Sequence, residues 1–142
     1  MNDFIASLYD PWFNYELYKD LQDSVFNAFD FQKLGWSLII VSIILLLVFY
    51  KLWDPVKKPR FKWIITLLFV GIFMFAICYA LLFNNIELLQ YLGNYTGDGG
   101  EPNPQYFILQ MAVISFVYGV ALAGLLSIPI KYISVGNKHN PF

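Results

Sequence analysis

Three long hydrophobic runs without a charged side chain dominate the sequence. They cover residues 36–50, 63–83 and 105–130. A helix needs about 20 residues to cross the hydrocarbon core of a bilayer, which is roughly 30 Å thick. The second and third runs have this length. The first has it if the helix continues to Trp53 and the Lys51 side chain reaches the membrane surface. The pattern predicts an all-α integral membrane protein with three transmembrane helices, at about 36–53, 62–84 and 104–131.

A four-residue periodicity precedes the first span. Asp10 followed by Pro11 is typical of a helix start, with a capping side chain and then a proline. From there we expect an amphipathic helix of about 20 residues, within an extracytoplasmic segment at 1–35 that precedes the membrane domain at 36–142. Its polar face is acidic, which favours a helix that packs on protein or lies at the outer surface over one that binds anionic lipid. The residues expected to dock a partner, the N-terminal stripe, are Phe13, Leu17, Leu21, Val25 and Phe29.

Proline, asparagine and aspartate punctuate the rest of the sequence. Asp54–Pro55 is expected to end the first span, because the residue before a proline avoids the helical region. Residues 86–92 are expected to continue the second helix by about two turns beyond the membrane. Asn103–Pro104 repeats the cap-plus-proline pattern at the start of the third helix, and Pro129 should kink or end that helix.

The charges between the spans predict the orientation of the protein. Residues 1–35 hold six acids and two lysines, and residues 84–104 hold three acids and no base. Residues 51–62 hold five bases and one acid, and the tail after 130 holds two lysines and no acid. Basic residues in short connectors mark the cytoplasmic side. The N-terminus is therefore expected outside and the C-terminus inside, with these topology determinants: Lys51, Lys57, Lys58, Arg60 and Lys62.

Small residues recur at intervals of four along the third span. A stripe of this kind lets two helices approach closely in a membrane. The sequence leaves open whether the partner helix lies in the same chain or in another subunit. The residues of this small-residue stripe are Ser115, Gly119, Ala123 and Ser127.

Residues that could support catalysis are scarce. The single histidine, His139, lies in the tail, and no cluster of histidine and acidic residues offers a metal site. The runs hold no acid, base or histidine, which argues against a proton relay or a coupled transporter. An enzyme and a bound cofactor are therefore not expected. The uncharged polar residues and the cysteine at membrane depth are Ser42, Thr66, Cys78, Gln110, Ser115 and Tyr118.

These observations favour a non-enzymatic membrane subunit that anchors or assembles a larger envelope complex, of the secretion, injection or motor type. Residues 10–33 and the 84–104 loop would then contact a periplasmic partner. The alternative is a homo-oligomeric channel or membrane-permeabilising effector, lined by the few polar residues of the spans. The abundance of Phe, Tyr, Ile and Asn suggests an AT-rich bacterial genome and hence an inner-membrane protein. The expected partners are membrane lipid and other membrane or periplasmic proteins, with no sign of a nucleic acid or a small-molecule substrate.

Overall fold

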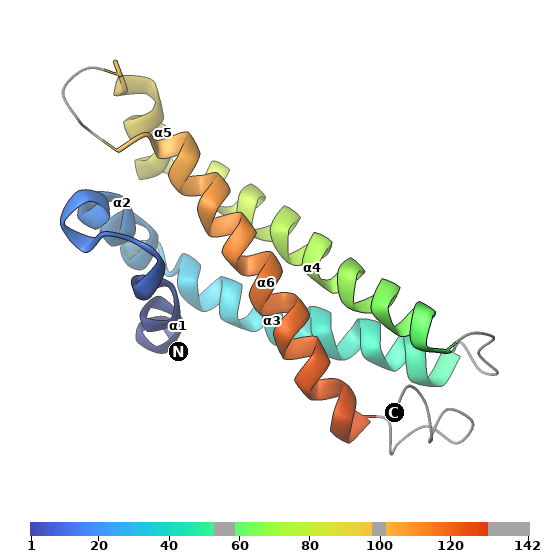
Figure 1. Ribbon diagram of the computed structural model, residues 1–142. Helices are drawn as coiled ribbons and strands as arrows, with labels where there is room; N and C mark the ends of the chain where they lie inside the picture. Colours follow the sequence, from blue (N-terminus) through green and yellow to red (C-terminus); the bar gives the residue numbers. More distant parts are fainter. Residues whose placement is uncertain (53–58, 98–101, 131–142) are drawn as a thin grey trace.

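The computed structural model of the chain describes residues 1–52, 59–97 and 102–130, and these form helices joined by short turns, without a strand (Figure 1). Three helices form a long bundle, and the remaining ones gather at one of its ends. In chain order the elements are α1 (Asn2–Tyr9), the 3₁₀ turn η1 (Asp10–Trp12), α2 (Tyr15–Asn27), α3 (Asp30–Leu47), the π-helical turn η2 (Val48–Leu52), α4 (Pro59–Phe83), α5 (Ile86–Asn94) and α6 (Pro104–Ile130).

Three helices are long and apolar enough to cross a membrane, as the sequence predicts. They cover Asp30–Tyr50, Arg60–Phe83 and Pro104–Ile130, with mean hydropathies of 2.2, 2.6 and 2.2. This arrangement is compatible with a multi-pass membrane protein. The first helix begins earlier than the expected Trp36, because Phe29 adopts a left-handed conformation (φ 57°) that separates α2 from α3 at Asp30. The expected boundary between residues 35 and 36 therefore lies inside α3.

Helices α4 and α6 pack closely along each other, because glycines face each other at their crossing. A Cβ atom built on Gly119 would lie 2.9 Å from Met74 Cγ and 3.5 Å from Gly71 Cα. A Cβ on Gly71 would lie 2.7 Å from the Phe116 ring. These distances show that α4 and α6 lie so close together that larger residues at the two glycine positions would not fit. Helix α3 packs against both of its neighbours and completes the bundle (Figure 1).

The expected single amphipathic helix from Asp10 is wrong. Asp10 and Pro11 lie in η1, which follows α1 directly, and Phe13 is extended (φ −123°, ψ 146°). Helix α2 begins only at Tyr15, because the Asn14 side chain caps it by accepting a hydrogen bond from the Glu16 N–H (3.2 Å). From Asp10 onward the chain thus forms a 3₁₀ turn and one helix of 13 residues, where a helix of about 20 residues was expected.

The expected continuation of the second span is also wrong. Helix α4 ends at Phe83, and Asn85 is extended (φ −74°, ψ 119°), so that α5 starts afresh at Ile86. The Asn85 side chain is the reason, because its Oδ1 accepts hydrogen bonds from the N–H groups of Glu87 (3.0 Å) and Leu88 (3.2 Å).

The start of the third helix is confirmed. Asn103 Oδ1 accepts a hydrogen bond from the Gln105 N–H (2.9 Å), and α6 begins at Pro104. Pro129 lies one residue before the end of the described part of α6. Other predictions fall outside the described residues. They concern Asp54–Pro55, Lys57, Lys58 and the tail with His139.

Candidate functional site at the helical cap

Helices α1, α2 and α5, together with η1, form a helical cap at the end of the bundle where α3 and α6 begin and α4 ends, and α1 extends from this end along the sides of α3 and α6 (Figure 1). The cap is part of the same core as the spans. Its buried side chains Tyr9, Val25 and Leu88 belong to one hydrophobic cluster with Cys78 and Phe107 of the spanning helices. The packing of these side chains therefore fixes the cap against the bundle.

A buried carboxylate in α3 links α2 to the start of α5. Asp30, at the first turn of α3, is almost fully buried, and its Oδ2 accepts a hydrogen bond from Asn85 Nδ2 (2.8 Å). Its Oδ1 pairs with the Lys33 ammonium (2.7 Å). Asn85 Nδ2 also donates to the Ser24 carbonyl oxygen (3.3 Å). Both carboxylate oxygens are thus satisfied, which is the condition for burying such a charge.

Tyr9 attaches α1 to α6. Its hydroxyl shares a hydrogen bond with Ser115 Oγ (2.7 Å), and its ring is fully buried against Phe31 and Tyr118. Burial raises the pKa of the Tyr9 phenol above its usual range, so the hydroxyl remains protonated. Ser115 Oγ also donates to the Met111 carbonyl oxygen (2.9 Å), which completes the pair without a free buried donor.

A second set of hydrogen bonds fixes η1 on α6. The Tyr118 hydroxyl donates to the Leu8 carbonyl oxygen and accepts from Trp12 Nε1 (2.8 Å). Gln110 Nε2 donates to the Trp12 carbonyl oxygen (3.0 Å). Gln110 and Tyr118, two of the polar residues expected at membrane depth, thus bind the N-terminal segment of their own chain.

We expect Tyr118→Phe to loosen α1 and η1 while leaving the bundle folded. The variant removes the hydrogen-bond partner of Trp12 Nε1 and of the Leu8 carbonyl, at a cost of about 1–3 kcal/mol. Hydrogen exchange of residues 1–12 in detergent should become faster than in the wild type. Tyr106→Phe is the control, because Tyr106 is exposed at the start of α6. Unchanged exchange in Tyr118→Phe would show that these bonds do not secure the segment.

The N-terminal stripe divides into two groups. Phe13, Leu21 and Val25 are buried and pack inside the chain, whereas Leu17 and Phe29 are 44% and 60% exposed. The division follows from helical geometry. Only Leu17, Leu21 and Val25 lie in α2, where each step of four residues advances about 40° beyond a full turn and so shifts the side chain around the helix. Phe29 lies beyond the end of α2 altogether. Leu17 and Phe29 therefore remain accessible to a partner.

The small-residue stripe packs within the chain. Ser115, Gly119, Ala123 and Ser127 are all buried between the helices of the bundle. Ser127 Oγ donates to the Gly124 carbonyl of its own helix (2.7 Å), and Thr66 Oγ1 does the same to the Lys62 carbonyl (2.9 Å). The stripe is thus covered by neighbouring helices of the same chain, and any contact with another subunit would use other faces.

The described topology determinants lie at the opposite end from the cap. Arg60 and Lys62 are in the first turn of α4, and Lys51 lies in η2, near the end of the first spanning helix (Figure 1). The acids Asp3, Asp10, Glu16, Asp20, Asp23 and Glu87 lie in the cap. The two ends of the bundle therefore differ in charge as well as in shape.

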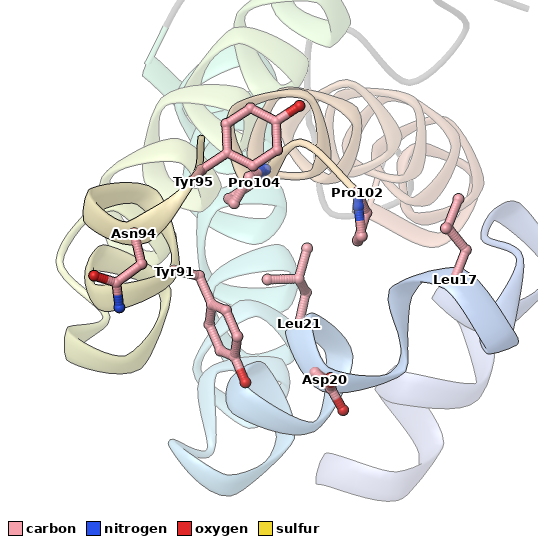
Figure 2. Close-up of a pocket in the computed structure, with 8 residues that line it drawn as sticks. All are labelled: Leu17, Asp20, Leu21, Tyr91, Asn94, Tyr95, Pro102 and Pro104. Carbon is pink, nitrogen blue, oxygen red and sulfur yellow. The ribbon is translucent and has the colours of Figure 1, made fainter. Parts of the chain in front are cut away.

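The cap carries a pocket of about 340 Å³ between α2 and α5 (Figure 2). Figure 2 shows the side chains of α2 on one side of this opening and those of α5 and the start of α6 on the other. Its lining combines apolar surface with two phenol groups, one carboxamide and one carboxylate. The lining residues are Leu17, Asp20, Leu21, Tyr91, Asn94, Tyr95, Pro102 and Pro104.

This pocket offers a surface for binding. Asp20 is the one charged residue among its described lining residues. Tyrosine and proline provide rigid apolar contact surface, and a phenol or carboxylate at the edge fixes orientation. Sequence reasoning identified Leu17 and Leu21 but missed Asp20, Tyr91 and Tyr95. Asn85 is the sequence feature that could have indicated this pocket. It caps a new helix, α5, which turns toward α2.

Among residues 1–52, 59–97 and 102–130, no group of three histidine, cysteine or acidic side chains is placed to hold a metal ion. Cys78 is a free, buried thiol in α4. Comparisons with models of protein families, with curated proteins and with solved structures found no match to this chain.

Proposed function

We propose that this chain is a non-enzymatic subunit of a larger envelope complex, of the secretion, injection or motor type. It would lie in the inner membrane of a bacterium, with α2 and α5 on the periplasmic side, α1 against the sides of the spans and the opposite end of the bundle in the cytoplasm. The charge distribution supports this orientation, because the acids lie in the cap and Arg60 and Lys62 lie at the other end. Its partners would be further membrane or periplasmic proteins.

The pocket between α2 and α5 is the observation that carries the proposal. Its walls come from residues 17–21, 91–95 and 102–104, which lie in two segments that the sequence separately suggests for contact with a partner. Leu17 and Tyr91 remain more than 40% exposed there although both are apolar or aromatic. A side chain with an apolar body and a basic or hydrogen-bonding tip would fit this lining, with Asp20 contacting the tip.

The lipid-facing surfaces of the spans favour a subunit over a homo-oligomeric channel. Away from the helix ends their exposed large residues are apolar or aromatic, whereas a conducting pore needs polar or carbonyl groups along its wall. Thr66, Ser115 and Ser127 bond to carbonyls of their own helices. The exposed positions include Ile40, Ile44, Ile64, Leu68, Ile72, Val113 and Leu125. Conductance from the purified protein alone in planar bilayers would instead support the channel.

We expect Asp20→Lys to release the partner proteins from the complex. The change places an ammonium in the pocket where a basic or donor group of the partner would lie, and like charges across an interface cost several kcal/mol. The measurement is purification of the tagged protein from its native membrane in mild detergent, followed by determination of the mass and protein composition of the particle.

Glu16→Lys is the matched control, because Glu16 is also an exposed acid of α2 but does not line the pocket. The two variants carry the same change in net charge, so a loss of partners only in Asp20→Lys assigns the contact to the pocket. Equal recovery of partners in both variants would contradict the docking role of the pocket. A wild-type particle that contains this chain alone would contradict the proposed function itself.

A further inference from the structure

A second, largely apolar groove lies beside α1. It has a volume of about 340 Å³ and is walled by three helices, α1, α3 and α6. Ile5 of α1 lies directly against Gly35 of α3, where a Cβ atom would come within 2.7 Å of Ile5 Cγ1. Helix α1 therefore lies alongside the bundle (Figure 1), and its residues form one wall of the groove.

The groove lies at membrane depth. Its walls on α3 and α6 include Gly35, Leu38, Leu122 and Leu125, all of which fall inside helices that are long and apolar enough to span a membrane. Leu125 and Phe4, at 66% and 63% exposure, lie among the lining residues and leave the groove open to its surroundings. The surroundings of spanning helices at this depth are the hydrocarbon chains of the bilayer.

The groove lining excludes a polar ligand. The Tyr118 hydroxyl is its one polar side-chain group, and this hydroxyl is already bonded to the Leu8 carbonyl and to Trp12 Nε1. Water in such a cavity would lack the two to four polar partners that it needs. If the groove were empty, the side chains of its walls would lose dispersion contacts. An apolar occupant restores these contacts and needs no polar partner.

The geometry points to one acyl chain of a bilayer phospholipid seated in the groove between α1, α3 and α6. A helix is about 10 Å across, and it cannot enter a slot between helices that already contact one another without displacing α1. A single hydrocarbon chain can. This site is separate from the partner pocket between α2 and α5, and it does not depend on the proposed function.

The test uses the full-length protein in phosphatidylcholine vesicles that contain a trace of phosphatidylcholine with a photoactivatable diazirine midway along one acyl chain. Mass spectrometry then locates the adducts after illumination. We expect a several-fold excess of adducts on groove residues such as Leu38 and Leu122 over lipid-facing residues of α4 such as Ile72. Labelling of the groove at the level of Ile72 would overturn the proposal.

Ala121→Phe places a bulky side chain in the groove, and Ala76→Phe is its matched control. Both alanines are exposed on spanning helices, but only Ala121 lines the groove. We expect Ala121→Phe to remove the excess labelling and Ala76→Phe to retain it. The wild-type pattern is itself a test that needs no variant. Retained labelling in a folded Ala121→Phe protein, or a disulfide between two copies of Ala121→Cys in membranes, would overturn the acyl-chain assignment.

Discussion

Gly119→Leu is expected to destabilise the protein by about 3 kcal/mol or more, because it inserts four carbons into a tightly packed crossing. A Cβ alone at this position would lie 2.9 Å from Met74 Cγ and 3.2 Å from Met74 Cβ, with Gly71 Cα just beyond. Helices α4 and α6 would have to separate to accommodate the leucine. Stability would be measured from helix content during SDS titration in mixed micelles.

Gly124→Leu is the control for this prediction. It introduces the same residue into the same helix, but a Cβ on Gly124 meets no atom within 4 Å. Both variants gain about 1 kcal/mol of helix propensity from the replacement of glycine, so their difference isolates the packing at the crossing. If Gly119→Leu were as stable as Gly124→Leu and lost only its association with other subunits, the close approach of α4 and α6 would be refuted.

Asn85→Ala is expected to have the second largest effect, a loss of about 3 kcal/mol. About 1 kcal/mol comes from the helix cap of α5, and roughly 2 kcal/mol comes from the hydrogen bond to the buried Asp30 carboxylate. The same variant would allow α5 to move away from α2, so hydrogen exchange in residues 86–94 should become faster. Chemical or SDS-induced unfolding measures the first effect, and hydrogen exchange measures the second.

Asn84→Ala is the neighbouring control, since Asn84 is exposed and its Nδ2 donates to the Ala80 carbonyl of its own helix (2.7 Å). It should change the stability little. Asn85→Asp gives a further check, because aspartate retains the cap but places a second carboxylate against Asp30. The two carboxylates repel each other, so Asn85→Asp should be less stable than the wild type although it retains the cap. Equal stability of Asn85→Ala and Asn84→Ala would refute the role of the Asp30–Asn85 contact.

The errors at the sequence level share one physical cause. The four-residue periodicity from Phe13 to Phe29 and the apolar residues after Phe83 both resemble continued helices. Side chains of Asn14 and Asn85 instead capture the first N–H groups of a new helix, and the chain turns there. Asparagine is compatible with a helix interior at a small cost, so its presence alone did not show that the helix ends.

The candidate site was partly foreseen. Leu17 and the segment at residues 84–104 were expected at a partner surface, and Leu17 lines the pocket of the cap together with residues 91, 94, 95, 102 and 104. Asp20, Tyr91 and Tyr95 could not be selected in advance. They become neighbours only because α5 folds back toward α2, and no periodicity within either segment encodes that approach.

The sequence by itself determined the three membrane-length helices and the start of the third. The length and apolar composition of a run and an asparagine–proline cap act locally, so they can be recognised in the sequence. Charged side chains are costly in hydrocarbon, so long runs without them indicate membrane-spanning helices. The tertiary structure decided what each face contacts. The bonds Tyr9–Ser115 and Asn85–Asp30 join residues 106 and 55 positions apart. Such pairings depend on how the helices cross and on which side chains fill the remaining space, and these are properties of the packed chain as a whole.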